Sequence, residues 1–212
     1  RATELLGPQA EPFAVHVGGQ ELPMHDPRYE PAMGVIYQLD ATPGRHTQGC
    51  QFTAAPGFKN EGPEFGVDRD AQAFRGEWVK ERMCLQHVVN AAGVCLFGYL
   101  SMDISFVPDF MSAVMGRPFG VDDMLLTGER IANMRQAFNV REGINPLAWP
   151  LPGRAYGRPP LPDGPTGGFT VAIEQMAAEH LGKMGWTHDA AIPERDVLER
   201  LGLPDVAHDL WG

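Results

Sequence analysis

Glycine and proline are concentrated in two zones of the sequence, between positions 7 and 67 and between positions 143 and 168. Turn dipeptides and X-Pro bonds make long helices and strands unfavourable in such zones. Elsewhere the apolar residues recur at helical rather than strand spacing. We therefore expect a mainly α, multihelical fold with long ordered loops and little strand. A loop-rich segment (1–70) and a helical domain (71–212) would form one compact unit.

Five segments carry the signals of helices. In the clearest one, Met124, Ile131 and Phe138 recur at intervals of seven residues, and the helix ends at Gly143. Acidic residues at 122–123 stand where a helix N-terminus favours negative charge. The other predicted helices cover 71–90, 108–115, the apolar stripe from Ile173 to Met184, and 193–201.

The loop-rich zones contain few predicted elements. Residues 1–13 show no helix or strand opening, whereas the alternation of Phe13, Val15 and Val17 predicts one short strand before the turn at Gly18. The second zone contains four large apolar residues that we expect to anchor an ordered loop onto the helices, namely Trp149, Leu151, Tyr156 and Leu161.

The charge balance excludes several classes of partner. With 27 acidic and 17 basic side chains the net charge is −10, whereas a nucleic-acid surface needs clustered Lys and Arg. No apolar run approaches the length of roughly 18 residues that a membrane span requires. We expect a cytoplasmic protein that binds neither nucleic acid nor membrane.

Three cysteines, Cys50, Cys84 and Cys95, are an odd number at wide spacing, which suits neither a disulfide framework nor a closed tetrathiolate site. Cys95 follows Gly93 inside an apolar run, where a thiol without a cation or metal stays protonated and inert. Taken alone, the residues around Cys95 therefore favour a structural cysteine.

Five motifs occur in order along the chain and change that interpretation. They are Gly18–Arg28 (G-x-E-x-P-x-x-D-P-R), Tyr37 nine residues before His46, Gly128–Gly143 (GERI-x-N-x-x-x-x-F-N-x-REG), Leu161–Pro165 (LPDGP), and the tail with Gly185-Trp186 and Leu201–Leu203. Together they resemble the aldehyde ferredoxin oxidoreductase family. The resemblance covers nearly the entire chain and corresponds to the helical C-terminal part of such enzymes.

The resemblance implies a cofactor set. In these enzymes a tungsten ion is held by dithiolene sulfurs of two pterins, beside a 4Fe-4S cluster that passes electrons to ferredoxin. The family motif D-x-x-G-L-C, whose cysteine is the fourth cluster ligand and whose other residues contact a pterin, stands here as Asn90, Gly93, Val94 and Cys95. Asn90 replaces an aspartate with a neutral amide, so its contact with the pterin should be weaker or differently arranged.

His46 matches a family histidine near the tungsten. The resemblance assigns it a catalytic role in proton exchange with the substrate oxygen during oxidation of a small aldehyde, and imidazole titrates in the useful range. Without the resemblance, one of seven histidines in a loop is more simply bonded to backbone. The same structural interpretation applies to His16, His25 and His87.

Other parts of the family pattern are missing from this sequence. Three further cluster cysteines and the N-terminal pterin-binding domain are absent, so we expect a partner domain in a longer parent protein and neither cofactor nor activity in the isolated chain. A tungsten-dependent reductase of aryl-CoA thioesters and a non-catalytic helical scaffold that lost its cofactors are the alternatives. A homodimer is left open.

Overall fold

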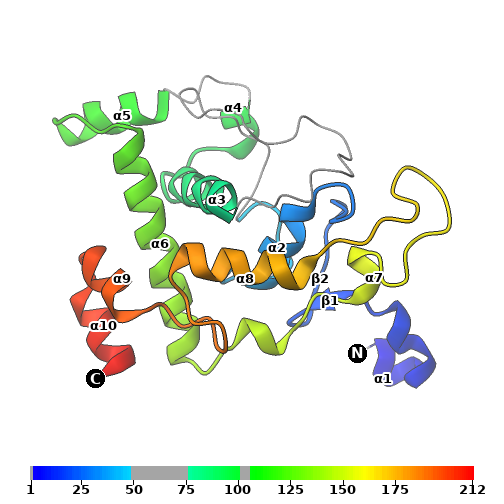
Figure 1. The fold of residues 1–212 in the computed structure, drawn as a ribbon. Helices are drawn as coiled ribbons and strands as arrows, with labels where there is room; N and C mark the ends of the chain where they lie inside the picture. The colour runs from blue at the N-terminus through cyan, green and yellow to red at the C-terminus, as the bar shows by residue number, and fades with distance from the viewer. Residues whose placement is uncertain (1, 49–75, 101–105) are drawn as a thin grey trace.

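In the computed structural model, which describes residues 2–48, 76–100 and 106–212, the longest helix is α6 (Val121–Arg141). Helix α3 (Gly76–Ala91) crosses it at close range (Figure 1). Gly128 permits this approach, because a Cβ atom there would lie 2.0 Å from the carbonyl oxygen of Cys84. The crossing of α3 and α6 is therefore set by a residue without a side chain.

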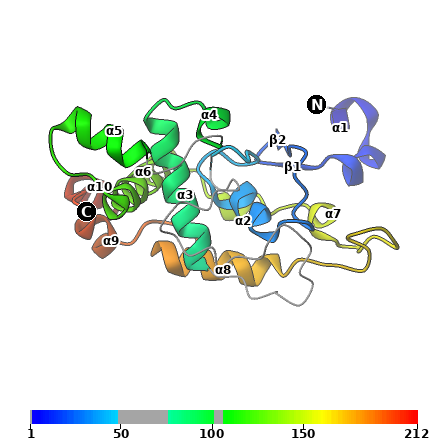
Figure 2. The same cartoon turned by 90° about the horizontal axis from the view of Figure 1, so that it is seen from above.

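Two apolar clusters hold the helices together. The larger one joins α2 (Pro31–Leu39), α3 and α8 (Ile173–Met184) and includes Val17 from the N-terminal hairpin. The smaller one lies where α3 meets α5 (Phe106–Met115) and the start of α6, and includes Tyr99 of α4 (Leu96–Leu100). Helices α9 (Arg195–Arg200) and α10 (Pro204–Trp211) pack on another side of α6 (Figure 2).

The mainly helical fold is confirmed, and most predicted helices lie where the sequence places them. Helix α8 spans Ile173–Met184 and ends at Gly185 in the left-handed conformation, α5 spans Phe106–Met115, and α9 lies within the predicted 193–201. The predicted start of α3 at 71 and the domain boundary at 70 fall outside the described residues. The division into two domains stays a prediction.

The N-terminal predictions were partly wrong. Residues expected to lack an element form α1 (Ala2–Leu6) and a 3-10 helix (Pro8–Phe13). The strand is shorter than expected, because β1 (His16–Val17) pairs antiparallel with β2 (Gln20–Glu21) around the Gly18 turn, while Phe13 is exposed in the 3-10 helix. The turn was located correctly, but the alternation of Phe13 and Val15 did not mark a strand.

The apolar repeat of α6 did not mark its buried face. Met124 is buried, but Phe138 is 55% exposed and Met134 is 47% exposed. The neighbouring helices approach the side that carries small and amide residues. There Asn133 accepts a hydrogen bond from Trp186 Nε1 at 2.9 Å, and Gln136 donates to the Ala191 carbonyl at 2.9 Å.

The proline-rich loop is ordered, with short elements η2 (Pro146–Ala148) and α7 (Gly153–Tyr156). Two of the four predicted anchors, Leu151 and Tyr156, are buried, whereas Trp149 and Leu161 remain 37% and 40% exposed. None of the described helices combines the length and apolar character of a membrane span.

Candidate functional site

Cys95 lies at the junction between α3 and α4, and its side chain is exposed. The preceding Gly93 has a φ of +71°, and a Cβ atom built on it would meet nothing within 4 Å. Val94 is half-buried and packs against the smaller apolar cluster. The thiol thus lies on an exposed turn, and the neighbouring Val94 holds this turn against the core.

Cys84, inside α3, gives the contrast. Its side chain is 1% exposed, and burial raises the pKa of its thiol to about 12. A thiol with such a pKa stays protonated and is a poor metal ligand. Cys50 lies outside the described residues, so Cys95 is the accessible thiol of the part that the structure covers.

His46 lies half-buried in the turn that follows α2. Its ring centroid is 4.6 Å from that of His25, and the two rings are tilted by 50°. The backbone carbonyl of His25 accepts a 2.9 Å hydrogen bond from the buried Tyr37 hydroxyl, which fixes this neighbour to α2. Burial, and then the charge that His25 can carry, lower the pKa of His46.

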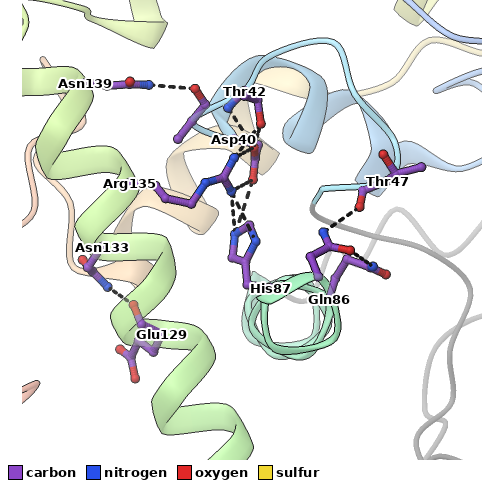
Figure 3. Close-up of polar contacts among 11 residues, drawn as sticks. Asp40, Thr42, Thr47, Gln86, His87, Glu129, Asn133, Arg135 and Asn139 are labelled. Carbon is purple, nitrogen blue, oxygen red and sulfur yellow. Dashed lines mark hydrogen bonds and ion pairs between the residues drawn. The ribbon is translucent and has the colours of Figure 1, made fainter. Parts of the chain in front are cut away.

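The side chain of Asn90 links the two segments. Its Nδ2 donates to the Thr47 carbonyl at 3.0 Å, and its Oδ1 accepts from Gln86 Nε2 at 3.0 Å. Figure 3 shows the two partners, Thr47 and Gln86 of α3, near one another. The turn that carries His46 is therefore held against the end of α3, from which the chain continues to Gly93 and Cys95.

A buried ionic cluster holds the other end of the same turn (Figure 3). Arg135 on α6 approaches Asp40 at 3.2 Å and donates to the Thr42 hydroxyl at 2.5 Å. One Arg135 nitrogen also lies 3.2 Å from His87 Nδ1, and Asn139 donates to the Ala41 carbonyl at 2.8 Å. These contacts anchor residues 40–42 to α6.

His87 is neutral within that cluster. Burial lowers its pKa to about 4, an effect that Asp40 opposes and Arg135 reinforces. Sequence reasoning left His87 with a structural role, which agrees with this position, but missed Asp40 and Arg135. No local motif marks these two residues, because they are 95 positions apart and meet only in the fold.

The described residues do not form a complete metal site here. Among residues 2–48, 76–100 and 106–212 no group of three or more His, Cys, Asp and Glu side chains could hold a metal ion. An accessible cysteine beside an open glycine is suited in chemistry and space to complete a cluster whose other ligands come from elsewhere. The candidate site thus comprises an exposed thiol just after α3 and an imidazole on the turn that Asn90 holds against that helix.

The family model "Aldehyde ferredoxin oxidoreductase, domains 2 & 3" matches residues 1–203. The chain belongs to the aldehyde ferredoxin oxidoreductase family. Curated relatives are the tungsten-containing aldehyde ferredoxin oxidoreductases of Pyrococcus horikoshii, 31% identical over 91% of this chain, and of Thermococcus kodakarensis, 29% identical over 91%. The chain spans only 31% of the length of each of these relatives.

A solved structure also resembles the chain. The active site complex BamBC of benzoyl coenzyme A reductase, in complex with 1,5-dienoyl-CoA, matches with a TM-score of 0.69 over 99% of this chain and 36% of its own. The sequence identity is 18%, so this likeness shows the fold alone.

Proposed function

We propose that this chain is the C-terminal part of a tungsten-pterin, 4Fe-4S oxidoreductase that oxidises aldehydes to carboxylates and passes the electrons to ferredoxin. The observation that carries the proposal is the hydrogen bond from Asn90 to the Thr47 carbonyl. It holds the His46 turn against the helix that leads into the exposed Cys95. A candidate proton acceptor and a candidate cluster ligand thus belong to one structural unit.

Cys95 is the proposed fourth ligand of the cluster. Its exposure leaves the sulfur accessible to iron delivered with three thiolates from the proposed partner domain, and iron lowers the pKa of a bound thiol. Gly93 and Val94 form the proposed edge facing the pterin, where the open space at Gly93 admits a bulky group. When bound, the tungsten-pterin group supplies the oxygen-transfer and two-electron chemistry.

His46 is the proposed proton acceptor. Conversion of an aldehyde and water to a carboxylic acid releases two electrons and two protons, so a base near the substrate oxygen assists the reaction. Its lowered pKa keeps the imidazole neutral, and hence able to accept a proton, to a lower pH than an ordinary histidine. The neighbouring His25 contributes to that shift.

The test is turnover by the longer protein that contains this chain, purified with its metals. We expect stoichiometric tungsten and iron, and reduction of ferredoxin with aldehydes but not reduction of aryl-CoA thioesters. Activity only with the thioesters would favour the aryl-CoA reductase alternative. A protein with neither metal would favour the scaffold alternative and contradict the proposal.

A further inference from the structure

Asn90 replaces the aspartate of the family motif, and its side-chain contacts assign it a specific task. The Thr47 carbonyl can only accept hydrogen bonds, so the group facing it must be the amide nitrogen of Asn90. That orientation turns Oδ1 toward the buried Gln86, whose Nε2 donates to it. The two hydrogen bonds therefore have a fixed donor-to-acceptor order: Gln86 donates to Asn90, and Asn90 donates to Thr47.

A carboxylate cannot take the place of this amide. At neutral pH an aspartate has only acceptor oxygens, and one of them would face the Thr47 carbonyl oxygen at about the 3.0 Å of the present contact. The interaction with Gln86 would survive, whereas the contact with Thr47 would turn from attractive to repulsive. The amide at position 90 is therefore needed for this particular contact.

The bond to Thr47 completes the fixation of the His46 turn. The beginning of the turn, at Asp40 to Thr42, is bound to α6 by Arg135 and Asn139. Its end is bound to α3 by Asn90, at the residue directly after His46. Without the bond to Thr47, the turn would lose this attachment to α3, and the imidazole would be held less firmly relative to the Cys95 segment.

We propose that Asn90 is a positioning residue that locks the His46 turn onto α3. It acts on the cofactor site through the placement of His46 rather than through charge donated to a pterin. This inference rests on the proposed role of His46, but the attachment of the turn to α3 through Asn90 can be tested without turnover.

The test is Asn90→Asp in the metal-loaded protein that contains this chain. We expect hydrogen exchange of residues 41–48 to accelerate and kcat to fall by about 10- to 100-fold, since small misplacements of a catalytic group have effects of this size. Iron and tungsten contents and the KM for aldehyde should change little, because Asn90 touches neither metal nor substrate in this account.

Asn145→Asp is the matched control. The amide oxygen of Asn145 accepts from the Leu147 backbone at 2.9 Å, a task that a carboxylate performs equally well, and its nitrogen makes only a long 3.4 Å contact with the Asp189 carbonyl. We expect exchange and kcat of this variant to match the wild type.

Two further results separate a lost donor from general damage. Lowering the pH protonates the new carboxyl group of Asn90→Asp and restores a donor, so protection of residues 41–48 should recover relative to wild type at the same pH. Asn90→Leu should show the same loss of protection without the recovery at low pH, and it serves as well if the aspartate variant fails to fold.

Unchanged exchange in both variants, or a gain in cofactor content and kcat with Asn90→Asp, would overturn the proposal. Exchange is independent of the substrate, so failure of the aldehyde assay alone would count only against the proposed function.

Discussion

At the scale of single residues, burial and then the neighbouring His25 lower the pKa of His46. Two imidazoles whose centroids are 4.6 Å apart do not both bind protons easily, and His25 contributes to the lowered pKa of His46. We predict that His25→Asn raises the pKa of His46 toward its ordinary 6.5, so that the acid limb of kcat/KM moves to higher pH. A pH profile of aldehyde oxidation measures this. An unmoved limb, or an equal shift in the exposed control His188→Asn, would contradict it.

His180 on α8 is a residue whose burial opposes stability. It is fully buried, and neither ring nitrogen has a hydrogen-bond partner among the described residues. Burial lowers its pKa to about 4, so the unfolded chain binds the additional proton between pH 6.5 and about 4. Stability is therefore present above pH 6.5 and is lost as the pH falls through this window.

We predict that His180→Leu raises the free energy of unfolding at pH 7.5 by about 1–3 kcal/mol, because it removes buried polar atoms that lack partners. The loss of stability on acidification should become smaller but persist, because His87, with a pKa of about 4, titrates in the same window. Urea unfolding at pH 7.5 and pH 5 measures both effects, with the exposed His208→Leu as control. A destabilised variant with undiminished acid sensitivity would refute the prediction.

At the scale of elements, helix propensity and steric packing predict opposite effects of adding a side chain at Gly128, where α3 and α6 cross. Helix propensity favours alanine over glycine, but here a Cβ atom would lie 2.0 Å from the Cys84 carbonyl oxygen. Because backbone must move, we predict that Gly128→Ala lowers the free energy of unfolding by about 1–3 kcal/mol. Gly182→Ala on α8 is the matched variant, since its Cβ would meet only His188 Nε2 at 3.9 Å. The free energy of unfolding of Gly182→Ala should rise by about 0.5–1 kcal/mol. Urea unfolding of both variants decides, and equal signs would disprove the steric argument.

The sequence predicts a helix well where one face of the helix is exposed to solvent and the other is buried. Helices α5 and α8 have that pattern and were located within a few residues. Helix α2 was missed because nearly all of it is buried, from Ala32 to Leu39, which leaves no polar face to mark its period. The repeat in α6 predicts the helix but not its buried face, because the close packing there uses Gly128 and amide side chains in place of large apolar ones.

At the scale of the whole molecule, the candidate site could be predicted only in part. Motifs predict His46 and the segment from Asn90 to Cys95 as site residues, and the structure links the two through the hydrogen bond between Asn90 and Thr47. The ionic cluster of Asp40 and Arg135 could not be predicted, because charged residues far apart in sequence are usually exposed. The chain spans 31% of its relatives' length, and the proposed function assigns the remaining cluster ligands to a partner domain.

Iron content tests the central claim most directly. In the metal-loaded protein that contains this chain, Cys95→Ala should lose the 4Fe-4S cluster, with iron falling well below four atoms per protein. Cys84→Ala removes the buried thiol of α3 and should keep the wild-type iron. An intact cluster in Cys95→Ala, with its electron paramagnetic resonance signal unchanged, would contradict the account.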